Sequence, residues 1–206
     1  MEISFGTLRI SVAPTVYEPA EDSFLLATYA SSLKGSILEI GCGCGIVSIS
    51  AAKADAINNI LGVDINTEAV ACSRHNAAAN SIKNCRFMQA NMFSSIPEGD
   101  KFDFILFNPP YLPTTREEKL ALESENAAYD GGESGLETFM QFAGQVSEHL
   151  APGGKVAVIA TSLNDGIKKT IEQLQQQVGP TQIVAEESFF FEKIALVEAT
   201  YGKAKS

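Results

Sequence analysis

The residues in this sequence that are best suited to chemistry are four consecutive ones, Asn108, Pro109, Pro110 and Tyr111. Two successive prolines hold φ at about −65° and lack N–H groups, so this backbone is stiff and its carbonyls are free to accept hydrogen bonds. The Asn108 side-chain oxygen and the Pro109 carbonyl then form two converging acceptors for both N–H bonds of one NH2 group, and Tyr111 offers an aromatic face to a planar group. The motif therefore predicts a site for a planar, neutral amide-type NH2 group.

The chemistry that such a site favours is methylation of that nitrogen. Its lone pair is delocalised into a π system, and hydrogen bonds to both of its protons favour a more tetrahedral nitrogen with more lone-pair density. Attack on a methyl group is then an in-line displacement that depends on positioning. No strong general base is required first, because the proton becomes acidic only after transfer. A rigid Pro-Pro turn without catalytic function is the alternative interpretation of the same residues.

A glycine-rich segment, residues 41–45, is the candidate binding loop for the methyl donor. Its glycines allow a tight turn and a close approach of the backbone to a ligand. A dinucleotide fingerprint has Gly or Ala at its sixth place, where this sequence has Ile46. Glu39, two residues before the loop, would repel a pyrophosphate and suits a cationic ligand such as an ammonium group.

Two further candidates follow at the ends of the next expected strands. Asp64 comes about 20 residues after the glycine loop, where a carboxylate accepts both ribose hydroxyls. Asn91 offers an oxygen to an adenine amine, and Met92 can cover the ring. Alone, each has an ordinary explanation as a turn acid or a loop residue. Together they predict S-adenosylmethionine, contacted by Glu39, Gly41, Cys42, Gly43, Gly45, Asp64, Ile65, Asn91, Met92 and Asn108.

Alternating strands and helices must position these residues. We expect a strand or hairpin over residues 3–12 and a helix over 20–33. Five parallel strands are expected over residues 36–40, 59–63, 85–89, 102–107 and 155–160, with helices over 46–54, 67–80, 136–150 and 165–177. Too few residues separate 182–190 from 194–201 for a helix, so these form a hairpin. The predicted fold is α/β and Rossmann-like, a class I S-adenosylmethionine-dependent methyltransferase with a mostly parallel seven-stranded sheet and a C-terminal antiparallel hairpin.

Length and composition limit the remaining choices. The 206 residues predict a single domain, with 45% hydrophobic and 19% charged residues and a formal net charge of −10. This charge weighs against functions that rest on contacts with a phosphate backbone. No apolar run is long enough for a membrane span, and the first residues lack a signal pattern, so we expect a cytoplasmic protein. Cys42 and Cys44 are interpreted as small loop residues, and no metal is expected.

At this point the sequence resembles the HemK family of release-factor glutamine methyltransferases, in the short archaeal and eukaryotic form that lacks an N-terminal helical domain. The resemblance rests on residues 16–23, 38–45, Asp64 and 108–114. It implies N5-methylation of the glutamine in the Gly-Gly-Gln motif of a class I peptide-chain release factor. It also implies that residues 1–34 cap the cofactor site, with Tyr17, Pro19 and Ser23 lining it, and that the loop 112–134 faces the substrate. Asn91 stands where relatives usually have Asp, but it keeps one acceptor oxygen.

The resemblance further implies a small zinc-binding activator protein on an apolar sheet edge, which would be the strand 85–89. Shielding of that edge by the chain's own loops is equally compatible with the sequence. The main alternative function is adenine-N6 methylation of DNA or RNA, which uses the same Asn-Pro-Pro-Tyr logic. It is opposed by the acidity of the chain and by the few residues left for a target-recognition domain. The residues 115–134 carry six acidic and two basic side chains, which fits either a solvated face or a basic protein partner.

Overall fold

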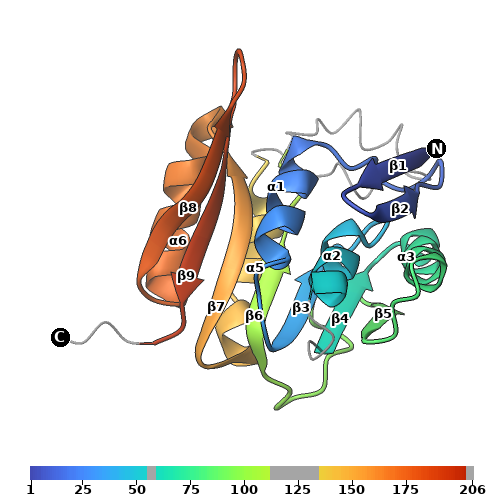
Figure 1. The fold of residues 1–206 in the computed structure, drawn as a ribbon. Coiled ribbons are helices and arrows are strands. Elements are labelled where there is room, and N and C mark those ends of the chain that lie inside the picture. Colours follow the sequence, from blue (N-terminus) through green and yellow to red (C-terminus); the bar gives the residue numbers. More distant parts are fainter. Residues whose placement is uncertain (55–58, 112–134, 203–206) are drawn as a thin grey trace, which may run out of the picture. The chain divides into compact units, whose positions relative to one another are not determined.

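The computed structural model describes residues 1–54, 59–111 and 135–202 (Figure 1). The chain divides into two compact units, Met1–Glu98 and Gly99–Ser206. The main sheet has seven strands, of which three belong to the first unit and four to the second. The expected mostly parallel α/β sheet with an antiparallel C-terminal hairpin is confirmed.

The first unit consists of a small hairpin followed by alternating strands and helices. Its elements are β1 (Glu2–Phe5), β2 (Leu8–Ser11), α1 (Glu21–Ala30), β3 (Ser36–Ile40), α2 (Ile46–Ala54), β4 (Asn59–Asp64), α3 (Thr67–Ala79) and β5 (Cys85–Gln89). The strands β5, β4 and β3 are parallel neighbours in that order, and β1 pairs with β2 in a separate antiparallel sheet. Residues 37–40 of β3 are all buried, as expected for a parallel strand covered on both faces. The carboxyl ends of these three strands therefore share one edge.

Local hydrogen bonds determine where α3 begins. The sequence favours Thr67 as the N-cap, but the side chain of Asn66 accepts the hydrogen bond from the Glu68 N–H at 2.9 Å. Asn66 is the cap because its backbone is extended while its side chain turns back onto the first helical turn. The helix therefore begins at Thr67, one residue earlier than a Thr67 cap would place it, and Glu68 remains in its first turn.

The second unit contains β6 (Phe102–Phe107), α5 (Glu137–Ala143), β7 (Leu150–Thr161), α6 (Gly166–Gln177), β8 (Thr181–Ser188) and β9 (Lys193–Thr200). Its strands follow the order β6-β7-β9-β8, with β6 and β7 parallel and β9 antiparallel to both of its neighbours. Helix α6 packs on β9 and β7 through its buried residues, which include Thr170 and Leu174. In Figure 1 the hairpin of β8 and β9 extends beyond the end of β7.

Two expectations in this unit are wrong in their boundaries. The helix expected over 136–150 ends at Ala143, and a short 3-10 turn, Val146–His149, follows Gly144. Glycine at this position favours the end of the helix because it has a poor helix propensity. The strand expected over 155–160 begins at Leu150, because Gly153 and Gly154 exchange backbone hydrogen bonds with Tyr201 and residues 150–154 belong to β7.

No helix among the described residues is long and apolar enough to cross a membrane.

Candidate functional site

The glycine loop joins β3 to α2 in the first unit and has a backbone that only glycine adopts readily. Gly41, Gly43 and Gly45 have φ values of 68°, 53° and 85°. A Cβ atom added to Gly45 would lie 3.0 Å from the Ser73 hydroxyl and 3.2 Å from Ile49. Gly41 is exposed and Gly43 half-buried, so the loop presents backbone to a ligand.

Asp64 fastens this loop to the end of β4. One carboxylate oxygen accepts the Gly43 N–H at 2.9 Å, and the other accepts the Asn66 N–H at 2.9 Å. Burial raises the pKa of Asp64, and these backbone hydrogen bonds act in the opposite direction. Since a carboxylate has about four acceptor positions, two used by the backbone leave room for further donors. The structure thus brings two predicted cofactor residues, Gly43 and Asp64, into direct contact.

Two side chains of α3, which belong to none of the predicted motifs, also hold the loop. The Ser73 hydroxyl donates to the Gly43 carbonyl at 2.8 Å, and the Asn76 amide donates to the Cys44 carbonyl at 2.9 Å. Both residues are fully buried. Their spacing of three residues places them on one face of the helix. The sequence shows this spacing, but it does not show that the two side chains are buried against the loop.

Glu39, in β3 two residues before the loop, is only 4% exposed. Its carboxyl group accepts the Ser48 N–H at 2.9 Å and also the Ser48 hydroxyl. Burial raises the pKa of Glu39 to about 8, despite the opposing hydrogen bonds from Ser48. Contact with a cationic ligand stays a prediction for Glu39, while the observed contacts tie β3 to the first turns of α2.

The N-terminal segment is tied to the same unit near Asp64. The Asn66 amide donates to the Thr15 carbonyl at 3.0 Å, and the Thr15 hydroxyl bonds Glu68. Asp22, which is 1% exposed, accepts from the Tyr17 hydroxyl at 3.1 Å and from the Ser23 N–H at 2.6 Å. Asp22 therefore joins two of the predicted pocket residues, a role that the sequence motifs do not indicate.

The other predicted residues of this unit occupy more exposed places. Asn91 and Ile65 are exposed, Met92 is half-buried and Pro19 is buried. Met92 has a φ of 49°, a conformation that is uncommon for a residue other than glycine. The Asn91 backbone N–H donates to the Ser94 hydroxyl at 3.1 Å, which fixes the turn after β5.

Cys42 and Cys44 are buried free thiols. Burial raises the pKa of both, and that of Cys44 reaches about 12. The Cys42 sulfur lies 3.6 Å from the Ser73 hydroxyl, and both cysteines pack as small side chains within the loop. Among the residues that the structure describes, no group of His, Cys, Asp and Glu is arranged to hold a metal ion.

The Asn-Pro-Pro-Tyr motif belongs to the second unit and directly follows β6. Phe107, the last residue of this strand, is 3% exposed, and its ring contacts that of Phe142 in α5 at a centroid distance of 4.6 Å. Pro109 is buried, while Asn108, Pro110 and Tyr111 are half-buried. A buried strand end thus anchors the motif at the carboxyl edge of the parallel pair β6 and β7, as predicted. The expected substrate-facing loop, 112–134, lies outside the described residues.

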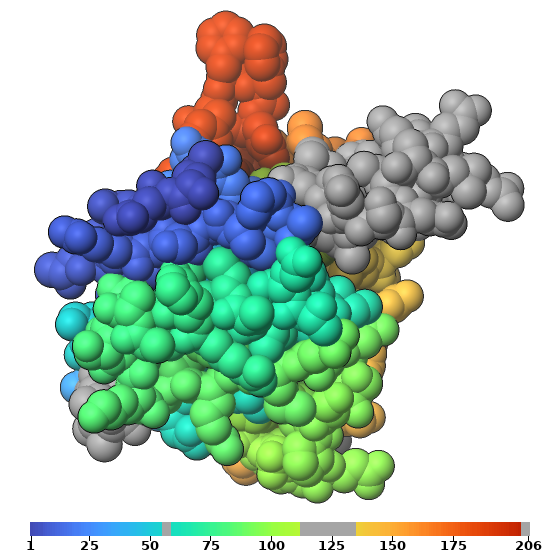
Figure 2. All heavy atoms as spheres, turned by 90° about the vertical axis from the view of Figure 1, so that its right-hand side faces the viewer, coloured from blue at the N-terminus to red at the C-terminus, as the bar shows by residue number. Residues whose placement is uncertain are grey.

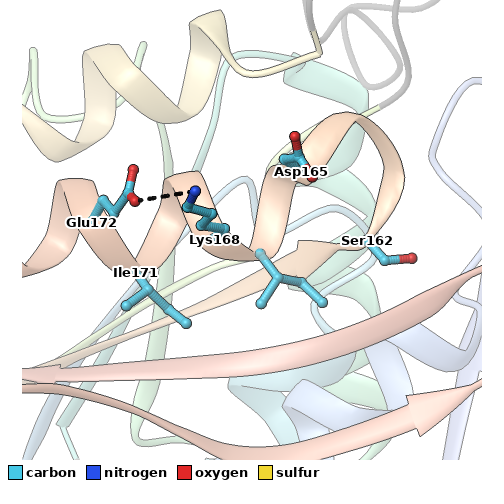
Figure 3. Close-up of a pocket in the computed structure, with 6 residues that line it drawn as sticks. Ser162, Asp165, Lys168, Ile171 and Glu172 are labelled. Carbon is cyan, nitrogen blue, oxygen red and sulfur yellow. Dashed lines mark ion pairs between the residues drawn. The ribbon is translucent and has the colours of Figure 1, made fainter.

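A shallow cavity of about 420 Å³ lies along α6 in the second unit. Figure 3 shows Ser162, Asp165, Lys168, Ile171 and Glu172 around it, with the ion pair between Lys168 and Glu172 at 3.9 Å. Both charged groups are largely exposed, and such a pair contributes little energy. None of the predicted site residues lines this cavity.

The comparisons with known proteins agree with this geometry. The family model described as "Methyltransferase small domain" matches residues 20–191. A Methanocaldococcus jannaschii protein, named as a protein N5-glutamine methyltransferase, is 39% identical over 97% of this chain and 98% of its own. The release factor glutamine methyltransferase of Aliivibrio fischeri is 34% identical over 73% of this chain, which spans only 55% of that relative.

Solved structures share the fold. The Mtq2–Trm112 complex of E. cuniculi, described as responsible for methylation of the translation termination factor eRF1, matches with a TM-score of 0.67 and 20% identity. The match covers 91% of this chain and 99% of that one. At this identity the similarity establishes the class I methyltransferase fold.

Proposed function

We propose a function from the family of this chain, which belongs to the HemK family of protein glutamine methyltransferases. The chain methylates the side-chain nitrogen of the glutamine in the Gly-Gly-Gln motif of a class I release factor. The observation that carries the proposal is the match to the Methanocaldococcus jannaschii relative along nearly the whole of both chains. The net charge of −10 favours a protein substrate over a nucleic acid. We assign the same role to the whole protein, although the bacterial relatives are longer than this chain.

The residues of the first unit fit S-adenosylmethionine as the methyl donor. Asp64 has acceptor positions beyond those used by Gly43 and Asn66, which suits the two hydroxyls of a ribose. The exposed backbone at Gly41 suits the amino-acid tail. Asn91 and Met92 would hold the adenine, and the segment with Tyr17, Pro19 and Ser23, joined through Asp22, would cover the pocket.

The Asn-Pro-Pro-Tyr motif would bind and orient the glutamine amide. S-adenosylmethionine, when bound, supplies an electrophilic methyl group on a sulfonium. The Asn108 side-chain oxygen and the Pro109 carbonyl would accept the two N–H bonds of the amide and hold its nitrogen in line with that methyl. Pro110 keeps the backbone stiff, and Tyr111 would stack on the amide plane. The N–C bond would form as the bond from the methyl carbon to sulfur breaks, and the nitrogen would then release its proton to solvent, so no basic side chain is needed beforehand.

We also propose that a small zinc-binding partner pairs with the outer edge of β5. The Asn84 carbonyl accepts from the Ile60 N–H of β4, and the Ala90 N–H donates to the Asp64 carbonyl of β4. Backbone groups alternate in direction along a strand, so those of Cys85, Phe87 and Gln89 face the outer edge. Arg74 already occupies the Phe87 carbonyl with bonds of 2.6 and 3.1 Å. Arg74 thus blocks only the Phe87 carbonyl, and a partner strand would pair with the Phe87 N–H and with the backbone groups of Cys85 and Gln89 at the two ends of the strand.

The proposed function is tested with the full chain, alone and co-expressed with the small partner. Labelled S-adenosylmethionine is incubated with the protein and either a release factor or duplex DNA, and the modified residue is located by peptide mapping. We expect label on the Gly-Gly-Gln glutamine, and none on a release factor in which this glutamine is replaced by Ala. Label on DNA instead would support adenine-N6 methylation and refute the proposal.

A further inference from the structure

Three phenylalanines occupy the tip of the β8–β9 hairpin and lie largely in solvent. Phe189, Phe190 and Phe191 are 42%, 92% and 87% exposed. The rings of Phe190 and Phe191 contact each other edge to face, with centroids 4.6 Å apart. In Figure 2 the atoms of this tip, drawn in red, form a clear projection. They form the most exposed group of large apolar side chains in the described part of the chain.

The composition of this turn has no conformational explanation. The Phe189 N–H donates to the Glu192 carbonyl at 2.7 Å, which leaves Phe190 and Phe191 as a two-residue hairpin loop. The hairpin turns that favour Gly and Asn do so because they require a positive φ. Neither Phe190 nor Phe191 has a positive φ, so this turn tolerates aromatic residues without requiring them. The exposure of two large aromatic side chains to water is nevertheless unfavourable. Exposed apolar groups of this kind mark interaction sites.

The base of the hairpin is held firmly to β7. The Ser162 N–H donates to the Lys193 carbonyl at 2.8 Å, and the Lys193 N–H donates to the Ser162 hydroxyl at 2.9 Å. A further hydrogen bond joins Thr161 to Glu192. The tip is therefore presented in a defined direction, and binding it requires little additional ordering of this chain.

Strand register places the tip on the sheet edge that carries Asn108. Phe107 pairs with Val158 of β7, which in turn pairs with Val197 of β9. Phe191 lies six residues from Val197 along the strand direction, so at 3.3 Å per residue it extends about 20 Å past the end of β6. Two strand spacings add about 10 Å sideways. A folded protein can span this separation, whereas a heptapeptide with glutamine at its centre reaches only about 10 Å in each direction.

The charges around the tip indicate what it binds. Glu186, Glu187 and Glu192 flank the phenylalanines, against the single cation Lys193, whose ammonium group bonds Glu186 at 3.1 Å. An aromatic tip with an acidic rim fits an apolar pocket surrounded by basic residues. The same rim opposes binding to anionic lipid or nucleic acid.

We propose that Phe190 and Phe191 form an exosite that inserts into an apolar pocket on the basic surface of the protein substrate, away from its glutamine loop. This inference rests on the proposed function and adds a determinant of substrate affinity to it. The exosite binds the folded release factor and takes no part in contacts with the glutamine amide or with the methyl donor.

The test is steady-state kinetics of the double variant Phe190→Ser/Phe191→Ser on two substrates, the release factor and a heptapeptide centred on its Gly-Gly-Gln glutamine. We expect KM for the release factor to rise at least tenfold with little change in kcat, and both constants for the peptide to stay unchanged. Tyr201→Ser is the matched control, because it removes a 36% exposed aromatic side chain at the opposite end of β9. Thermal melting verifies that both variants fold.

Each other outcome refutes the exosite. An unchanged KM for the release factor would do so while leaving the proposed function intact, as would an equal loss on protein and peptide. Binding of the wild type to phosphatidylserine vesicles that the double variant loses, with an unchanged KM, would assign the tip to a membrane. A dimer in solution that the double variant loses, again without a change in KM, would assign the tip to a second copy of the chain. A wild type that methylates neither substrate would instead refute the proposed function itself.

Discussion

Glu39 and Asp64 are two carboxyl groups at neighbouring strand ends, and their hydrogen bonds give them different roles. Glu39 is buried and bonded to Ser48 of the following helix, whereas Asp64 is partly open and bonded to the glycine loop. We infer that Glu39 supports the loop and that Asp64 contacts the ligand. The sequence shows both residues, but it does not show which one is accessible.

The raised pKa of Glu39 has a consequence for stability. An unfolded Glu39 loses its proton near pH 4.5, whereas the folded one keeps it to about pH 8. The folded state therefore binds more protons in this interval, and its free energy of unfolding falls as pH rises, by up to about 1.4 kcal/mol per pH unit. Glu39→Gln can still accept the hydrogen bonds from Ser48 but does not titrate, so we expect its free energy of unfolding to lose this part of the pH dependence.

Urea denaturation of both proteins at pH 5, 6.5 and 8 measures the effect. The stability of the variant relative to the wild type should increase steadily over this range. The exposed Glu172→Gln serves as the control, and its curve should follow that of the wild type. Parallel curves for the wild type and Glu39→Gln would contradict the assignment.

Substitutions of Asn108 and Asp64 should separate methyl transfer from cofactor binding. Asn108→Ala removes one of the two proposed amide acceptors, and we expect kcat to fall by about 10²–10³-fold with nearly unchanged affinity for S-adenosylmethionine.

Asp64→Ala removes the proposed ribose acceptor and the loop contact to Gly43, and we expect the affinity for S-adenosylmethionine to fall at least tenfold. Calorimetry gives the affinities. Near-normal turnover of Asn108→Ala, or unchanged affinity of Asp64→Ala, would contradict the respective role.

At the scale of elements, the strands could be predicted well and the contacts between elements could not. The strands β3, β5 and β6 have their expected bounds, because each is a short segment rich in β-branched, aromatic or other apolar residues that is followed by a loop. The long helix expected after residue 135 is wrong, since apolar periodicity continues past Gly144 although the helix does not. Asn66 replaces Thr67 as the cap because either side chain suits that position and only the backbone geometry decides between them.

The candidate site shows the same division. The glycine loop and Asp64 were predictable from the order of motifs along the chain, and their contact confirms that they lie together. Ser73, Asn76 and Asp22 were not, because their importance arises only when α3 and the N-terminal segment pack against the loop. Such buried polar residues become evident when their hydrogen-bond partners, distant in sequence, are known.

The proposed partner surface on β5 gives a prediction for this element. Gln89→Pro removes an outward-facing N–H without removing a bond to β4, so the sheet should be retained while strand pairing at the edge is lost. We expect binding of the small partner to weaken at least tenfold in a pull-down titration, with unchanged thermal stability. Gln89→Ala, which loses only the side-chain bond to Ile65, is the control. Equal binding by both variants would place the partner elsewhere.

At the scale of the whole molecule, acidity is the dominant property. A chain with a net charge of −10 and a pI near 4.7 attracts a basic substrate over distances comparable to the Debye length. We expect KM for the release factor to rise several-fold when salt increases from about 50 to about 300 mM, because screening weakens this attraction. The KM for S-adenosylmethionine should change far less.

Initial rates at varied substrate and salt concentrations give both constants. The double variant Glu186→Gln/Glu187→Gln should show a shallower salt dependence, because it removes two charges of the hairpin rim. Glu2→Gln/Glu68→Gln, which removes two acidic charges from the other unit, provides the comparison. A KM that is independent of salt would show that the acidic surface has no part in substrate capture.

The hairpin tip also offers a spectroscopic use. The sequence contains no tryptophan. Replacing Phe190 by Trp would therefore install the sole indole fluorophore of the enzyme at the 92% exposed end of the loop, with an amphipathic ring close in character to the one it replaces. Its emission would shift to the blue when the ring leaves water, so engagement of an unlabelled, tryptophan-free substrate could be followed in real time during stopped-flow mixing.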